Sequence, residues 1–325
     1  MITLRTDAIR VVVDDEQGAT ITGVFDADGR NALAHYDWET PAPPSRGLGY
    51  GDDDQDFHAG FRGGWQETFP NAGLPSVIDG VRLPFHGEAA TSRWTVDEVA
   101  STSCRMHVPA RLPLVLHRTM RLDPERPVLY LEGAVENVGA VPAQFVWGHH
   151  PAFPATAGAR IDYPAGARIR PDADRTGGVA LDAVTWPDAQ TPDGAVDLSV
   201  IPDADIHQLF YVDRLAEGWA AVRQPAGGVS VGLAWDAEVH PYSWLWIQRG
   251  DPGFPFYGRA RMMAVEAQTA WPYDGLAGAR RRNMAHLLQP GERLTSWYTI
   301  SLFEDAGSPV TGVARDGSLT FGGDR

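Results

Sequence analysis

The chain has 325 residues, 43% of them hydrophobic, and a formal net charge of −15 at pH 7. This composition supports a sizeable core and argues against disorder, while the negative charge disfavours binding to nucleic acids or to anionic membranes. The sequence contains no lysine, which excludes enzymes that depend on a Schiff-base, P-loop or kinase-type lysine.

Strand-like runs dominate the chain. In order, runs rich in β-branched and aromatic residues occur at residues 9–13, 19–25, 128–135, 219–223, 229–235, 242–248, 262–266 and 294–303. Turn signals separate several of them, as at Gln17-Gly18 and Gly227-Gly228. Helical periodicity is scarce, and the best candidate is residues 276–288, with a loop containing one helical turn as the alternative. The pattern predicts one large all-β domain over residues 1–325, with a polar, glycine-rich tail that frays from about residue 306.

A long loop is expected near the N-terminus, where Pro41-Ala-Pro-Pro44 is followed by the acidic run Asp52-Asp-Asp-Gln-Asp56. Long loops in compact β proteins are often functional. Alternate aspartates of the acidic run have the spacing of a calcium loop. However, Phe57 stands where that loop needs glycine, and Gly63 stands where it needs glutamate. We interpret the run as a solvated acidic loop.

Cys104 is the only cysteine, so neither an intrachain disulfide nor a thiolate-based zinc site can form. The N-terminal residues lack the basic and apolar segments of a secretory leader, and no window of about twenty residues is apolar enough to cross a membrane. We expect a cytoplasmic protein. The sequence does not indicate its oligomeric state.

Two remote segments carry the most evident chemistry. Trp147-Gly-His-His-Pro-Ala-Phe153 places the imidazole of His150 beside a strand end, and Val265-Glu-Ala-Gln-Thr269 places the carboxylate of Glu266 in an apolar, strand-like run. A histidine and a glutamate in one pocket could open and close a sugar ring by moving two protons. The plainer alternative for this histidine is a buried, hydrogen-bonded structural role.

Two further patterns point to other kinds of site. His149 and His150 could ligate a metal together with His86 and Glu266, as in a cupin, but adjacent strand residues point to opposite faces, which makes this interpretation secondary. Gly228-Val-Ser-Val-Gly232 matches the nucleophile elbow of hydrolases. That elbow needs a sharp turn at the serine, whereas this serine lies within an alternating strand.

Tryptophan is abundant, with 11 residues in the chain. Sugar-binding sites use aromatic faces against the C–H surfaces of pyranose rings, although most tryptophans in a β sandwich belong to the core. Trp65 is our first candidate for a sugar contact because it lies in a glycine-rich loop.

Four elements occur in a characteristic order: Gly63-Gly-Trp-Gln-Glu-Thr-Phe-Pro-Asn-Ala-Gly73; Leu83-Pro-Phe-His-Gly87; Val135-Glu-Asn-Val-Gly139 with Gly148-His-His-Pro-Ala-Phe153; and Val265-Glu-Ala-Gln-Thr269 with Leu288-Gln-Pro-Gly-Glu292. Together they resemble the aldose 1-epimerase (galactose mutarotase) family over about residues 1–305. The resemblance implies a large antiparallel β supersandwich, in agreement with the all-β pattern.

The resemblance also implies a function and a set of site residues. His150 is then the general acid and Glu266 the general base of an isomerase that interconverts the α and β anomers of a free aldose. His86 and Asp205 are implied to bind the monosaccharide. Asn71 lies near the place of an arginine that many mutarotases use, and we count it among the substrate-binding candidates. The family needs neither metal nor cofactor.

Several positions depart from the family pattern. Ala267 replaces a proline, and Ala152 replaces an aromatic residue. Ala90 stands where hexose-6-phosphate epimerases carry an arginine, which argues against a phosphorylated sugar, although Arg93 or Arg62 could substitute for that cation. A hexose-6-phosphate 1-epimerase and a non-catalytic sugar-binding protein on the same scaffold remain the alternatives.

Overall fold

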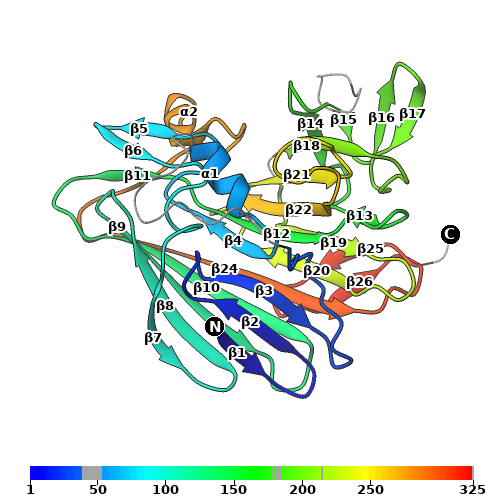
Figure 1. Ribbon diagram of the computed structural model, residues 1–325, viewed down its shortest axis with the longest axis horizontal. Coiled ribbons are helices and arrows are strands. Elements are labelled where there is room, and N and C mark those ends of the chain that lie inside the picture. The colour runs from blue at the N-terminus through cyan, green and yellow to red at the C-terminus, as the bar shows by residue number, and fades with distance from the viewer. Residues whose placement is uncertain (39–52, 177–178, 180–183, 214, 324–325) are drawn as a thin grey trace.

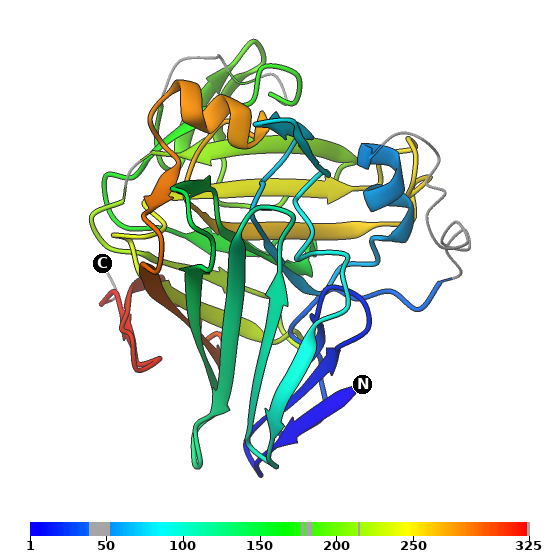
Figure 2. The same ribbon diagram turned by 90° about the vertical axis from the view of Figure 1, so that its left-hand side faces the viewer.

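The computed structural model describes residues 1–38, 53–176, 179, 184–213 and 215–323. Within these residues the chain forms a ten-stranded and an eight-stranded sheet, both antiparallel throughout (Figures 1 and 2). The predicted all-β fold, a large antiparallel supersandwich, is confirmed.

The ten-stranded sheet contains, from one edge to the other, β1 (Ile2–Arg5), β2 (Arg10–Asp14), β3 (Thr20–Phe25), β4 (Trp65–Thr68), β12 (Gly148–Pro154), β22 (Arg261–Gln268), β21 (Tyr242–Arg249), β18 (Ile206–Val212), β14 (Arg168–Pro171) and β15 (Val184–Thr185). The eight-stranded sheet contains β13 (Arg160–Asp162), β19 (Trp219–Arg223), β20 (Ser230–Trp235), β24 (Arg293–Phe303), β10 (Val128–Asn137), β9 (Leu114–Leu122), β8 (Ser103–Pro109) and β7 (Thr95–Val99).

The remaining described strands form small two-stranded sheets: β5 (Ser76–Ile78) with β6 (Val81–Leu83), β11 (Ala143–Phe145) with β23 (His286–Leu288), β16 (Asp188–Thr191) with β17 (Gly194–Asp197), and β25 (Val310–Val313) with β26 (Leu319–Phe321). The helices of the described part are α1 (Asp53–Gly60) and α2 (Gly275–Arg281). Neither is long and apolar enough to span a membrane.

Three local expectations need correction, for the helical segment at residues 276–288, the acidic run and the C-terminal tail. The helix expected at residues 276–288 ends at Arg281, and β23 begins at His286. The described part of the acidic run is not a loop, because α1 begins at Asp53, and carboxylates in a first helical turn are stabilised by the helix dipole. The proline-rich part of that expected loop lies outside the described residues.

The tail also differs from the expectation. Residues beyond 306 do not simply fray, since β25 and β26 form a hairpin. Val310 and Val313 are buried against Trp219 of β19, which gives this polar segment an apolar anchor.

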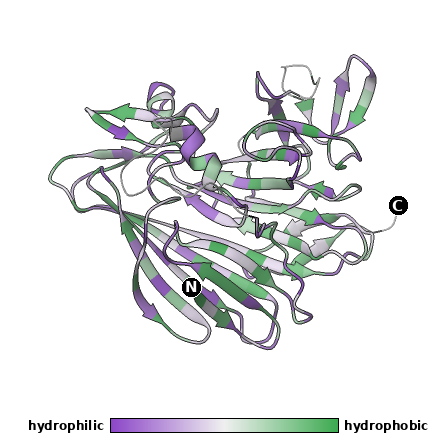
Figure 3. Cartoon of the chain, in the orientation of Figure 1, coloured by the Kyte–Doolittle hydropathy of each residue, from purple (hydrophilic) through white to green (hydrophobic). Residues whose placement is uncertain are grey.

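The main core lies between the two large sheets. Buried and partly exposed residues alternate along β9, as expected for a strand with one face in the core. Figure 3 shows this alternation of hydrophobic and hydrophilic residues along strands of the eight-stranded sheet. In contrast, β12 and β22 are buried along almost their whole length, so further side chains must cover their second face.

A buried ion pair lies within this core. Arg118 of β9 places Nη1 3.4 Å from Oε1 of Glu67 on β4, and both side chains are 1% exposed. The indole of Trp147 donates a 2.7 Å hydrogen bond to Oε2 of the same glutamate. Burial raises the pKa of Glu67, and these two partners oppose that shift. The pair joins one sheet to the other.

Ser230 lies within β20, as expected, and is fully buried. Its hydroxyl accepts a hydrogen bond from the backbone N–H of Gln224. The structure therefore supports the interpretation of this segment as a hairpin strand rather than a nucleophile elbow.

Candidate active site

A cavity of about 200 Å³ lies against the central strands β12, β22, β21 and β18 of the ten-stranded sheet. Its other walls come from α1, from residues 85–86 and from the loop 251–256. Figures 1 and 2 both place α1 at one end of β21 and β22. Pockets for drug-sized ligands usually measure about 300–1,000 Å³, so this one suits a smaller molecule.

Strand alternation on β12 sends two adjacent histidines to opposite faces of the sheet. His149 points between the sheets, where its ring centroid lies 4.8 Å from that of Tyr298 on β24. His150 points the other way and lines the cavity. The prediction that at most one of the pair faces a given site is confirmed.

Glu266 reaches the same cavity from β22, which pairs with β12. Trp244 of β21 lies directly opposite Glu266 in the register. Alternation then places Trp246 and Gln248 on the same face of β21, and all three residues line the cavity. The face of the sheet turned away from the core is therefore the floor of the site.

His150 and Glu266 meet on this floor. Nε2 of His150 lies 3.5 Å from Oε1 of Glu266, and the two side chains are only 7% and 2% exposed. Oε2 of the glutamate accepts a 2.8 Å hydrogen bond from Nε2 of Gln268, two residues further along β22. The two side chains that sequence reasoning selected from segments more than a hundred residues apart thus lie within reach of one ligand.

Burial shifts both pKa values toward the neutral forms. It raises the pKa of Glu266 to about 8, opposed by the Gln268 hydrogen bond, and lowers the pKa of His150 to about 4. Between these values the pair holds one proton, and burial favours the state in which the carboxyl group carries it. The roles implied by the resemblance call for the other placement, with the proton on His150 as the general acid and Glu266 ionised as the general base.

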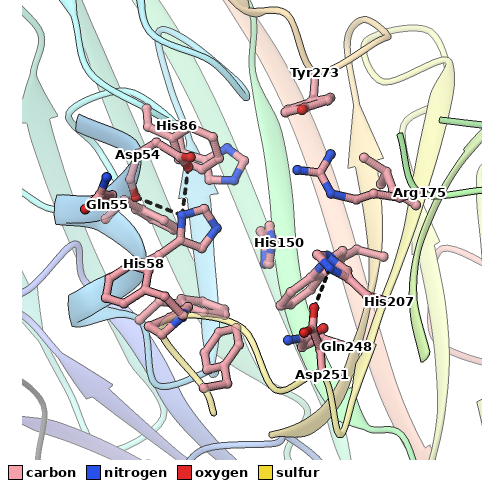
Figure 4. A pocket seen from close by; sticks show the side chains of 18 of the residues that line it. Asp54, Gln55, His58, His86, His150, Arg175, His207, Gln248, Asp251 and Tyr273 are labelled. Carbon is pink, nitrogen blue, oxygen red and sulfur yellow. Dashed lines mark hydrogen bonds and ion pairs between the residues drawn. The ribbon is translucent and has the colours of Figure 1, made fainter. Parts of the chain in front are cut away.

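His86 is held as a neutral donor beside this pair. The backbone N–H of Gly73 donates a 3.0 Å hydrogen bond to its Nδ1, so in the neutral ring the proton is carried by Nε2. Burial and the nearby His150 keep the pKa of His86 well below its usual range. The rings of His86 and His150 are 5.4 Å apart, and Figure 4 shows both at the cavity.

Further polar side chains line the walls (Figure 4). His58 of α1 places Nδ1 2.8 Å from Oδ1 of Asp54, one helical turn earlier. His207 of β18 places Nδ1 2.8 Å from Oδ2 of Asp251. Arg175, in the segment that follows β14, points into the cavity from the same side as His207. Sequence reasoning selected none of these residues as a ligand contact.

Aromatic rings complete the enclosure. Phe61 packs edge-on against His150, with centroids 5.4 Å apart, and Trp246 packs at 5.8 Å from the same ring. These rings exclude water around the pair, which explains why burial dominates its pKa values.

Three predicted ligand contacts, Trp65, Asp205 and Asn71, do not line the cavity. Trp65 is fully buried because it lies on the core face of β4, where it packs on Tyr298. Asp205 lies outside the cavity with a side chain 64% exposed, 3.7 Å from Arg261. The tryptophans that line the cavity are Trp244 and Trp246 instead.

Asn71 is also buried, but it has an evident structural task. Its amide donates 2.9 Å hydrogen bonds to the backbone carbonyls of Leu74 and Pro84, and its Oδ1 accepts one from the N–H of Leu276. These bonds fix the loop that carries Gly73, which in turn orients His86. Asn71 thus acts on the site through the backbone.

Among the described residues, no group of three or more histidine, cysteine, aspartate or glutamate side chains is arranged to hold a metal ion. The cupin-like metal set fails on geometry, because His149 points away from His150 and packs at 5.5 Å from His240 in the core.

The comparisons with known proteins agree with the fold. The sequence matches a family model over residues 24–302, described as a domain of unknown function, DUF4432. The chain belongs to the DUF4432 family. No curated protein sequence matches it.

The structure of this DUF4432 protein is similar to several solved structures. A "Putative aldose 1-epimerase" from Escherichia coli K12 superimposes with a TM-score of 0.66 at 18% identity, covering 93% of this chain and 98% of the other. A galactose mutarotase-like protein from Lactobacillus casei ATCC 334 gives 0.62 at 16% identity, over 93% and 100%. A galactose mutarotase related enzyme from Lactobacillus acidophilus gives 0.61 at 15% identity, over 93% and 97%.

These likenesses confirm the predicted resemblance at the level of fold. This chain has the architecture of the galactose mutarotase-like proteins over 93% of its length. At such low identity the fold alone carries over, and any activity must be argued from the cavity itself.

Proposed function

We propose that this DUF4432 protein is an isomerase of the aldose 1-epimerase type, which interconverts the α and β anomers of a free, reducing monosaccharide. The observation that carries the proposal is the His150–Glu266 pair, 3.5 Å apart at the floor of a cavity of about 200 Å³. We further propose that the chain acts as one domain and that it works in the cytoplasm.

The reaction needs two proton transfers. A pyranose opens when the anomeric hydroxyl loses its proton while the ring oxygen gains one; the C1–C2 bond then rotates and the ring closes on the other face. A positioned acid and base each contribute roughly a hundred- to ten-thousand-fold in rate. Because the second half reverses the first, one shared proton is sufficient, and the chemistry requires neither metal nor cofactor.

The pair supplies that proton. In the assignment implied by the resemblance, protonated His150 gives its proton to the ring oxygen while Glu266 removes the O1 proton. The product of this step is neutral His150 beside protonated Glu266, which is the state that burial favours. The site therefore stabilises the protonation state that accompanies the open-chain sugar, and the proton must cross from Glu266 to His150 before a closed ring opens.

The remaining walls suit a polar, ring-shaped ligand. His86 presents an N–H donor and Gln248 presents an amide, both within reach of ring hydroxyls. Trp244 and Trp246 present aromatic surface of the kind that packs against sugar C–H groups.

Polarimetry on freshly dissolved α-glucose, α-galactose and glucose 6-phosphate tests the proposal. We expect the wild-type protein to speed the approach to anomeric equilibrium for at least one reducing sugar. Saturable binding with no faster equilibration would instead support the sugar-binding alternative. No effect on any reducing sugar, neutral or charged, would refute the proposed activity.

A further inference from the structure

Arg175 is a cavity residue that the proton chemistry does not use. It reaches the cavity from the segment after β14, and Figure 4 shows its guanidinium pointing across the space toward His58 and His86. Its side chain is 29% exposed, so it is accessible to a ligand.

The guanidinium is held in place from behind. It stacks over the ring of Tyr273, 4.9 Å from the centroid, and Nη1 donates a long, 3.5 Å hydrogen bond to Oδ1 of Asp172. The other oxygen of Asp172 already accepts a 2.7 Å hydrogen bond from Tyr211. A guanidinium carries five N–H donors, and the bonds to Asp172 and to the Tyr273 side chain leave several of them for a ligand.

Three of the four histidines of the cavity do not supply a comparable positive charge, and the fourth, His58, is paired with Asp54. His207 is engaged on both nitrogens, by Asp251 and by the indole N–H of Trp246, and burial together with Arg175 lowers its pKa. The pKa values of His86 and His150 are lowered as well. Arg175 is therefore the one permanent cation among the described residues that line the cavity.

We propose that the sugar carries a carboxylate group, as in a hexuronic acid, and that Arg175 binds this group. The inference rests on the proposed function, because His150 and Glu266 are taken to hold the anomeric end of the same molecule. A carboxylate matches the planar fork of a guanidinium and can accept two parallel hydrogen bonds from it.

A phosphate ester fits less well. It carries nearly two negative charges, and the same cavity already contains the carboxyl groups of Asp54 and Asp251. One guanidinium in the presence of two carboxyl groups balances a monoanion better than a dianion. The arginines considered earlier do not contribute, since Arg93 is 72% exposed beside Glu16 and neither Arg93 nor Arg62 is among the described residues that line the cavity.

The test compares anomer exchange of D-glucuronate, D-galacturonate, D-glucose and D-glucose 6-phosphate by NMR, with kcat/KM obtained for each sugar. We expect the wild-type protein to prefer at least one uronate over both glucose and the phosphate. In Arg175→Gln the ratio of uronate to glucose turnover should fall about ten- to a hundredfold, the usual loss for a hydrogen bond between charged groups. Arg175→Lys keeps the charge without the fork and should fall in between.

Arg105→Gln is the matched control. Arg105 has a side chain that is 56% exposed and lies on β8 of the eight-stranded sheet, whereas the cavity lies against the ten-stranded sheet. It should leave the ratio unchanged. Equal or better turnover of glucose, a preference for the phosphate, or an unchanged ratio in Arg175→Gln would each overturn the inference.

A failure of the proposed function remains distinguishable. If no sugar is turned over, calorimetric titration with D-glucuronate decides the matter. Binding that Arg175→Gln weakens at least tenfold supports the carboxylate site without the isomerase, and equal or absent binding in both proteins overturns it.

Discussion

Glu67 and Glu266 are both buried carboxyl groups of the same sheet, with burial raising the pKa of each, yet their surroundings differ. Glu67 points between the sheets and faces Arg118 at 3.4 Å. Glu266 points away from the core, lines a cavity and faces His150 at 3.5 Å. Burial of a carboxyl group therefore does not by itself mark a site.

The partner makes the difference. An arginine cannot release its proton in a protein, so the Glu67–Arg118 pair can bind but cannot exchange protons. A histidine titrates readily and can act as acid or base. Of the two pairs, the one on the cavity face combines an exchangeable proton with room for a ligand. Matched substitutions on the two faces test whether this difference determines turnover.

The largest expected effect is on turnover. Glu266→Gln should lower anomer exchange at least about a hundredfold, because it removes one proton-transfer partner, while the fold persists. His150→Gln should have a similar effect, and the double variant should be little worse than the poorer single one, since the two residues act as a unit. Exchange kinetics and a denaturation curve on each variant provide the check.

The matched variants on the core face serve as controls. Glu67→Gln and His149→Gln should lower the free energy of unfolding without a comparable loss of turnover per folded molecule. A hundredfold loss of turnover in a folded Glu67→Gln protein would remove the distinction between the two faces.

The next largest effect is on stability. Arg118→Met leaves Glu67 buried without its cation, which should lower the free energy of unfolding by about 3–5 kcal/mol. Adding Glu67→Met should recover part of that loss, because the double variant no longer buries an unpaired charge. Urea denaturation measures both, and a single variant as stable as the wild type would show that the ion pair contributes little.

A smaller effect should appear in the pH dependence. The pair holds one proton between the two pKa values, about 4 for His150 and about 8 for Glu266. Turnover should therefore fall as the pH drops through about 4, where His150 gains a second proton, and as it rises through about 8, where Glu266 loses the shared one. Rates corrected for the uncatalysed reaction test this, and a single limb near pH 6.5 would contradict it.

The smallest effect concerns Gln268, which positions Glu266. Its hydrogen bond lowers the pKa of that carboxyl group. Gln268→Met should therefore move the alkaline limb of the pH profile to higher pH, with a modest change in maximal turnover. A limb that stays in place would show that the hydrogen bond does not tune the pair.

The sequence was sufficient for the all-β class and for selecting His150 and Glu266, which the structure brings together at the cavity. His150 and Glu266 lie in segments whose order and neighbours resemble a known family, and alternation on β12 separates His149 from His150. His86 is also at the cavity, as expected. These predictions succeeded because they rest on the strand period of two and on motifs with fixed order.

The other contacts could not be derived in this way. Strands β4 and β21 are buried on both faces, so hydrophobicity does not tell which face of either strand is turned toward the core, and Trp65 was preferred to Trp244 and Trp246. Arg175 comes from an irregular segment without periodicity, and its position depends on tertiary contacts with Asp172 and Tyr273.

The most direct test is the exchange of sugar anomers at equilibrium, followed by NMR magnetisation transfer at neutral pH on wild-type protein and on folded Glu266→Gln. We expect exchange well above the uncatalysed rate with the wild type, and a protein-catalysed rate at least about a hundredfold lower with the variant. Equal exchange with both proteins would contradict it, because the proton held at the cavity floor would then have no part in opening the ring.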